Sequence, residues 1–125
     1  AGGTEDIEIE EDHAFLRTGL PREVLRKLRR VHWVVQDELD LHGLTGDEAA
    51  LETARFLAES ARRGLRCLRI IHGKGLGSRN REPVLKGRIR KLLARKSEVL
   101  AYCEPPPIHG GSGAVIVLLD AKAGP

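Results

Sequence analysis

The first clear pattern along the chain is an alternation of apolar and polar residues over positions 38–42. Leu39 and Leu41 alternate with Asp40 and His42, and a period of two is typical of a strand that buries one face. The apolar side chains then lie on one face, and a carboxylate and an imidazole lie on the other. Here the strand ends in polar residues, and a glycine turn then leads into a helix. Open α/β sheets bind their ligands at such carboxyl ends of strands.

Apolar residues spaced three or four apart predict three helices. One covers residues 21–31, one follows the capping box Thr45-Gly46-Asp47-Glu48 and ends before Gly64, and one opens at Pro83. Three further strands are predicted at residues 65–71, 98–103 and 114–119. The last of these is apolar at every position, which indicates burial on both faces.

This order of elements predicts a single α/β domain of the form β-α-β-α-β-β, with two layers and a four-stranded mixed sheet. We expect right-handed crossovers around each helix, parallel pairing among the first three strands, and a fourth strand that reverses beside or near the third. The chain is expected to divide into a flexible acidic tail at residues 1–19, a basic helical arm at 20–35 and the folded domain at 36–122. Within the tail, Ile7 and Ile9 alternate with acids, so an edge strand there is the alternative.

Charge is distributed unevenly along the chain, although the formal net charge is only +3. Residues 5–12 carry six acids and no base, whereas residues 62–96 carry thirteen Lys or Arg and one acid. So many positive charges in one segment are better explained by binding to a polyanion than by a need for solubility alone. The basic helix at 21–31 either docks on the domain through its leucines or touches a nucleic-acid backbone or partner. Trp33 is expected to anchor it by apolar contact rather than to stack on a base.

The remaining composition excludes several classes of protein. No apolar run approaches the ~20 residues that a membrane helix needs, and no secretory signal opens the chain. Cys67 and Cys103 lie in apolar strand-like segments without ligand spacing. They are expected to be buried reduced thiols, and the protein is expected to be cytoplasmic.

Three His-Gly dipeptides stand at predicted strand boundaries, in His42-Gly43, His72-Gly73-Lys74-Gly75 and His109-Gly110-Gly111-Ser112-Gly113. If the first two strands are neighbours and the last is antiparallel to them, the three loops meet at one edge of the sheet. Glycines there would let a phosphate approach bare backbone amides, although each could also serve a plain turn. The predicted substrate-binding residues are Gly43, Gly73, Lys74, Gly75, Arg79, Arg81, Gly111, Ser112 and Gly113.

The polar side chains at this edge indicate acid–base chemistry. His42 is predicted to act as base or acid, with Asp40 polarising it or acting in its own right, and His72 is a further catalytic candidate. Asp40 could instead hold its own turn, and His109 is expected to be only an exposed loop residue. Clustered carboxylates and zinc-type histidine spacing are missing, so we expect no metal and no cofactor.

These segments resemble the signatures of the Smr (small MutS-related) domain. The matching stretches are Leu39-Asp40-Leu41-His42-Gly43, His72-Gly73-Lys74-Gly75 and Gly110-Gly111-Ser112-Gly113-Ala114, in the expected order. The resemblance implies a fold similar to the C-terminal domain of a bacterial translation initiation factor, and nuclease activity. For the stand-alone bacterial type it also implies that Asp40 and His42 are tied to cleavage of messenger RNA at collided ribosomes.

Three functions follow as hypotheses. The first is a metal-independent endoribonuclease that acts on RNA at stalled ribosomes, since RNA carries its own nucleophile in the 2′-hydroxyl. Its products would end in a 2′,3′-cyclic phosphate and a 5′-hydroxyl. The second is a DNA-nicking endonuclease in repair or recombination, and the third is a non-catalytic module that binds nucleic acid or the ribosome. Nucleic acid is the expected partner in each case, with RNA favoured, and no membrane contact is expected.

Overall fold

The structure is a computed structural model that describes residues 8–9, 14–73 and 81–120 of the 125-residue chain, with side chains described at 14–73 and 84–120. Its strands are β1 (Glu8–Ile9), β2 (Ala14–Leu16), β3 (Asp37–Asp40), β4 (Cys67–Ile71), β5 (Val99–Cys103) and β6 (Ala114–Leu119). Its helices are α1 (Arg22–Arg29), α2 (Gly46–Arg62) and α3 (Arg81–Arg95), and the short 3-10 turns η3 (Pro107–His109) and η4 (Gly111–Gly113) lead into β6.

The strands form one mixed sheet in the order β1-β2-β5-β6-β4-β3. Strands β3 and β4 are parallel, and β6 lies between β4 and β5 and is antiparallel to both. The three strands predicted to be parallel therefore run in one direction and the last strand reverses, as the sequence predicted. Strand β6 is buried along its whole length, which confirms the central position inferred from its apolar residues.

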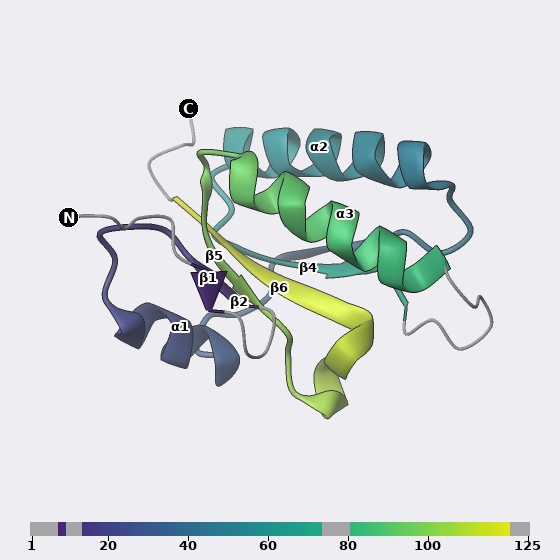
Figure 1. Cartoon of the computed structure of the whole chain (residues 1–125). Coiled ribbons are helices and arrows are strands. Elements are labelled where there is room, and N and C mark those ends of the chain that lie inside the picture. Colours follow the sequence, from purple (N-terminus) through teal and green to yellow (C-terminus); the bar gives the residue numbers. More distant parts are fainter. Residues whose placement is uncertain (1–7, 10–13, 74–80, 121–125) are drawn as a thin grey trace.

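Helices lie on both faces of the sheet (Figure 1), and a separate hydrophobic core fills each side. Helices α2 and α3 cover one face, and Leu57, Leu68 and Ile89 belong to the core between them and the sheet. Helix α2 begins at the predicted capping box: the Thr45 side chain accepts a hydrogen bond from the Glu48 amide, and Glu48 accepts one from the Thr45 amide. This pair satisfies two of the amides that a helix N-terminus leaves without a partner.

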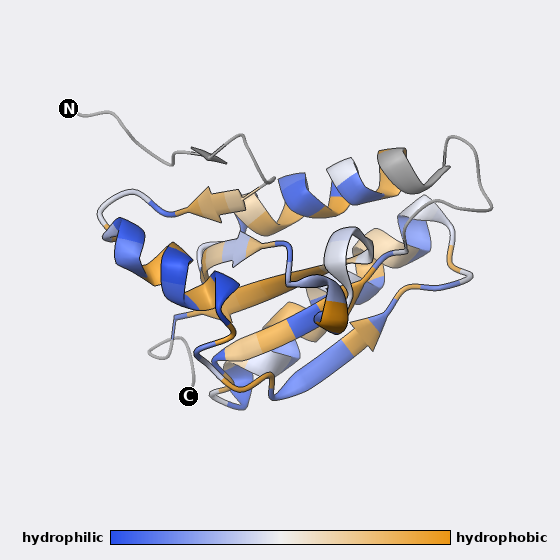
Figure 2. Ribbon diagram, turned by 90° about the horizontal axis from the view of Figure 1, so that it is seen from below, coloured by the Kyte–Doolittle hydropathy of each residue, from blue (hydrophilic) through white to orange (hydrophobic). Residues whose placement is uncertain are grey.

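Helix α1 lies on the opposite face of the sheet. Most residues of this helix are hydrophilic (Figure 2). Leu25 and Leu28 are buried in a second core against β2, β5 and β6, and Trp33 packs at the margin of that core. Docking through leucines is therefore confirmed, and Trp33 makes the apolar contact that was expected. The Arg66 guanidinium also lies over its ring, 5.6 Å from the centroid.

Cys67 and Cys103 are buried thiols, as predicted. Burial raises the pKa of the Cys67 thiol to about 11, so this thiol stays protonated near neutral pH. Every helix within the described residues is too short or too polar to cross a membrane.

The sheet has six strands, and the prediction of four was wrong. Strands β1 and β2 come from residues 1–19, which the sequence predicted to be a flexible tail, and β2 pairs with β5 in the sheet. Phe15 is buried and stacks on Tyr102, with ring centroids 5.4 Å apart. Strands of two and three residues are too short to show a period, so the acidic composition decided the prediction. The likeness to a translation initiation factor domain remains a prediction.

Candidate active site

Three segments that are distant in sequence meet at one edge of the sheet. Asp40 pairs with Ile71, which in turn pairs with Ala114. Beyond the pairs, the Leu41 amide donates to the Ile71 carbonyl at 2.8 Å, and the His72 amide donates to the Gly113 carbonyl at 3.0 Å. The predicted meeting of the three His-Gly loops is therefore confirmed for the backbone of the described residues.

Asp40 and His42 lie on the exposed side of this edge. Leu39 and Leu41 belong to the core under α2 and α3, so Asp40 between them faces the opposite side of the sheet. Both Asp40 and His42 are exposed, and Asp40 Oδ1 accepts a hydrogen bond from the His42 amide at 2.9 Å. Asp40 therefore does hold its own turn, which Gly43 continues with a φ of 83°. The turn thus holds the Asp40 carboxylate at the His42 backbone and leaves both side chains exposed to solvent.

His72 occupies a different environment from that pair. Its side chain is only 3% exposed, and Nδ1 lies 2.9 Å from the Gly73 carbonyl oxygen. Burial lowers the pKa of His72, and the positive charges of Lys86 and Arg90 on α3 lower it further, against opposing effects of Gly73 and Glu104. The imidazole thus lies beneath α3, on the other side of the sheet from Asp40. The structure does not bring His72 together with the exposed pair. Asp40 is in register with Ile71, and His72, the next residue after Ile71, therefore points to the opposite face of the sheet.

The buried imidazole makes the stability of the fold depend on pH. Because the folded pKa of His72 is below its unfolded value of about 6.5, the unfolded chain binds protons more readily. The neutral imidazole therefore contributes fully to the free energy of unfolding above about pH 6.5. Below that pH its contribution decreases, by at most about 1.4 kcal/mol per pH unit. Urea unfolding at about pH 7.5 and about pH 5.5 is expected to show a steeper loss for the wild type than for His72→Gln. Equal losses would contradict this assignment.

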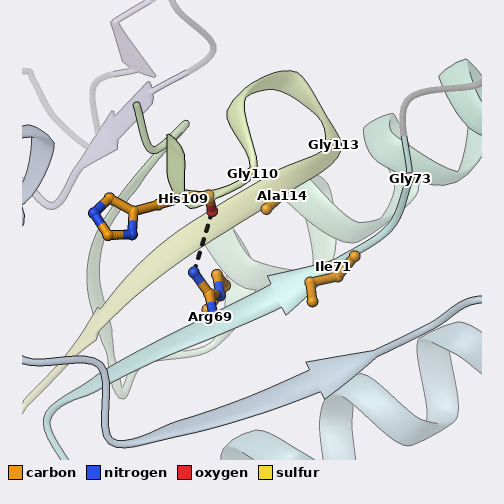
Figure 3. A pocket seen from close by; sticks show the side chains of 7 residues that line it. All are labelled: Arg69, Ile71, Gly73, His109, Gly110, Gly113 and Ala114. Carbon is orange, nitrogen blue, oxygen red and sulfur yellow. Dashed lines mark hydrogen bonds between the residues drawn. The ribbon is translucent and has the colours of Figure 1, made fainter. Parts of the chain in front are cut away.

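A pocket of about 370 Å³ opens on the exposed side of the sheet, between β4 and the η turns (Figure 3). Its lining residues are Arg69, Ile71, Gly73, His109, Gly110, Gly113 and Ala114. Ile71 is the strand partner of Asp40, so the catalytic candidate stands next to the wall of this pocket. The sequence did not identify such a cavity, because its walls come from β4 and from a loop forty residues later.

Arg69 connects three elements at this pocket. Its Nε donates to Glu38 Oε2 on β3 at 2.6 Å, and its Nη2 forms an ion pair with the same carboxylate. Its Nη1 donates to the His109 carbonyl oxygen at 3.2 Å (Figure 3). The guanidinium is thereby held at the pocket wall by partners on both sides. Its place between the apolar residues Leu68 and Ile70 is the sequence signal that could have identified Arg69, which was predicted only as part of a basic segment.

The glycines of the second and third loops have a structural use that differs from the predicted one. The amides of Gly73, Gly111 and Gly113 donate to the carbonyls of Gly113, Pro106 and Gly110, at 2.9, 3.1 and 3.0 Å. The expectation that these three amides are bare is therefore wrong, because each donates to a carbonyl of the turns. Phosphate binding at these glycines remains a prediction. Gly73 and Gly113 still line the pocket, and Ser112 is exposed beside it.

Backbone geometry requires glycine at two positions of the third loop, Gly110 and the predicted binding residue Gly111. Gly110 has a φ of 121°, and a Cβ atom there would lie 2.8 Å from the Ala114 Cβ. Gly111 has a φ of 51°, which L-residues with a side chain adopt only at a cost. The predicted contacts of Lys74, Gly75 and Arg79 lie outside the described residues, as does the Arg81 side chain at the start of α3.

The sequence model of the Smr domain matches residues 39–120. This chain belongs to the Smr domain family. It is 35% identical over 106 residues to the "Ribosome rescue factor SmrB" of Photobacterium profundum, covering 85% of this chain and 57% of that protein. It is 33% identical over 117 residues to the "Probable DNA endonuclease SmrA" of Escherichia coli, covering 94% and 63%. The chain thus spans little more than half the length of these relatives.

A solved structure shows the same fold. YdaL, a stand-alone small MutS-related protein from Escherichia coli, superposes with a TM-score of 0.75 at 31% identity, over 95% of this chain and 91% of that chain. The match covers almost the whole chain, so it extends beyond the Smr domain itself into residues before 39.

Within the Smr domain of this chain, His109 meets its prediction only in part. Its side chain is exposed, as expected, and the imidazole projects away from Ile71 and Gly73 (Figure 3). Its backbone nevertheless forms part of the pocket wall and accepts the Arg69 hydrogen bond. Among the described residues, no group of three or more His, Cys, Asp or Glu is arranged to hold a metal ion.

Proposed function

We propose that this Smr chain is an endoribonuclease that cleaves RNA by acid–base catalysis, on messenger RNA at stalled or collided ribosomes. The observation that carries the proposal is the solvent-exposed turn in which Asp40 accepts the His42 amide beside the Arg69 pocket. The printed names of its relatives, a ribosome rescue factor and a probable DNA endonuclease, support action on nucleic acid.

The proposed reaction uses the substrate's own nucleophile. His42, with Asp40 beside it, accepts the proton of the ribose 2′-hydroxyl, and the 2′-oxygen attacks the adjacent phosphorus. The bond from phosphorus to the 5′-oxygen breaks, and that oxygen takes a proton from an acid or from water. The products are a 2′,3′-cyclic phosphate and a 5′-hydroxyl. A positioned base or acid contributes typically about 10²–10⁴-fold, and no metal is needed to generate the nucleophile.

Arg69 is the cation that we assign to the phosphate. Its guanidinium lies at the wall of the pocket, on the same face of the sheet as Asp40. Part of its donor capacity is used by Glu38 and by the His109 carbonyl, which orient the group. An arginine offers five N–H donors in a planar fork, so an oriented guanidinium can still contact a phosphate oxygen.

Cleavage of matched oligomers tests the proposal against its two rivals. A single-stranded RNA, its all-deoxy counterpart and a deoxy strand with one ribonucleotide are incubated with and without EDTA, and the product ends are identified. We expect cutting only 3′ to a ribonucleotide, cyclic phosphate ends and no effect of EDTA. Equal cutting of the all-deoxy strand would establish DNA nicking and exclude the 2′-hydroxyl mechanism. Binding of every strand without cutting would establish a binding module.

A further inference from the structure

Ile108 is the most exposed of the large hydrophobic side chains that the structure describes, at 85%. It lies in η3, which projects from the sheet on the side opposite α2 and α3 (Figure 1). The proposed reaction gives this residue no role. A single exposed apolar side chain is common on protein surfaces, so the surroundings of Ile108 decide whether it has a use. Covering it with a ligand would remove apolar area from water, which is favourable.

The backbone around Ile108 is held rigidly. Three consecutive prolines precede it and restrict the backbone φ angles, and Pro105 is buried. The His109 amide donates to the Pro106 carbonyl at 2.8 Å, and the Gly110 amide donates to the Pro107 carbonyl at 3.1 Å. Arg69 binds the His109 carbonyl from below. The backbone on both sides of Ile108 is therefore held by prolines and hydrogen bonds, and its side chain points into solvent.

Ile108 also lies at the rim of the candidate site. The next residue, His109, is part of the pocket wall, and consecutive Cα atoms are only about 3.8 Å apart. A phosphate bound at Arg69 would place the base of a neighbouring nucleotide within reach of this side chain. Apolar side chains at such positions insert beside bases and unstack them, and protein recognition of RNA mostly uses unstacked bases.

We propose that Ile108 is a positioning residue that packs against a nucleobase flanking the cleaved phosphate and unstacks it from its neighbour. The inference rests on the proposed function and deepens it, because it names single-stranded, base-bearing RNA as the substrate that the rim accepts. Unstacking frees the sugar–phosphate link to rotate, so that the 2′-oxygen, the phosphorus and the 5′-oxygen can come into line.

The first test compares Ile108→Ala with Val84→Ala, a matched removal of an apolar side chain that is 67% exposed on α3. Ile108→Ala is expected to lower kcat/KM about tenfold on an RNA oligomer without changing the melting temperature. Val84→Ala is expected to leave kcat/KM unchanged. On an oligomer with an abasic ribonucleotide next to the cut, wild type and Ile108→Ala are expected to be equal. The same loss on intact and abasic oligomers would overturn the proposal, because the effect of Ile108 would then not depend on the base.

A second test does not depend on cleavage, so it separates failure of this inference from failure of the proposed function. A 2′-O-methyl oligomer, which the 2′-hydroxyl mechanism cannot cut, carries 2-aminopurine at the flanking base. Wild type and Val84→Ala are expected to raise its fluorescence by unstacking the base, and Ile108→Ala is expected not to. An equal rise with Ile108→Ala would overturn the proposal whether or not the protein cleaves RNA.

Discussion

His42→Ala is expected to reduce cleavage of single-stranded RNA by at least about 10²-fold, while its affinity for the same RNA stays within about twofold of the wild type. The imidazole is exposed and joins no core, so its removal does not disturb the fold. Basic groups elsewhere on the surface continue to attract the phosphate chain. Single-turnover cleavage rates and filter-binding affinities at one fixed salt concentration measure the two effects separately. Unchanged cleavage by a carefully purified variant would identify a contaminating nuclease.

Asp40→Asn separates the two roles of the neighbouring carboxylate. The amide oxygen of asparagine can still accept the hydrogen bond from the His42 amide, so the turn that Asp40 holds is preserved. Only the negative charge beside the imidazole is lost. If Asp40 takes part in the chemistry, the cleavage rate decreases about as much as in His42→Ala and the acidic limb of its pH profile changes. A variant as active as the wild type would show that Asp40 serves the turn alone.

Arg17→Ala is expected to lower the free energy of unfolding by about 2–4 kcal/mol. The guanidinium donates to the carbonyls of Ala94, Lys96 and Val99, at 3.1, 2.8 and 2.8 Å. It therefore satisfies acceptors at the C-terminal end of α3, where a positive charge is also favourable. It lies 4.8 Å from the centroid of the Phe15 ring. Urea denaturation followed by circular dichroism measures the loss.

Two variants control this measurement. Arg22→Ala removes an exposed arginine of α1 and is expected to change stability by no more than about 0.5 kcal/mol. Arg17→Lys keeps the charge but loses the planar fork, so it is expected to recover only part of the stability. A loss below about 0.5 kcal/mol in Arg17→Ala would mean that residues before α1 contribute little to the fold.

The prediction for Arg17 concerns a segment that sequence reasoning placed in a flexible tail. The run Ala14-Phe15-Leu16 has no period of its own and follows a block of acids. What makes it a strand is the free edge of β5 and the Tyr102 ring, to which Phe15 is matched in the register of the sheet. Both partners come from about 85 residues later in the chain. A short strand of this kind is determined by its neighbours rather than by its own pattern.

The candidate site divides in the same way. The pairing of Asp40 and His42 on an exposed face follows from alternation within one strand, and the structure agrees with it. The orientation of His72 depends on which face of β4 the helix α3 covers. The use of the Gly73, Gly111 and Gly113 amides depends on carbonyls that other residues of the turns supply. Gly73 and its acceptor Gly113 become neighbours only after folding, so the sequence did not show that this amide is used. Phosphate binding at these glycines remains a prediction.

The sequence by itself determined the order and type of the main elements, the capping box of α2 and the exposed positions of Asp40 and His42. Each of these depends on contacts within a few residues or on a regular period of apolar positions. Only the tertiary structure decided the two N-terminal strands, the burial of His72, the Arg69 pocket and the outward position of Ile108. Each of these depends on a segment that is distant in the sequence. That segment either provides a hydrogen-bond partner or a covering side chain or does not, and no local sequence pattern shows which.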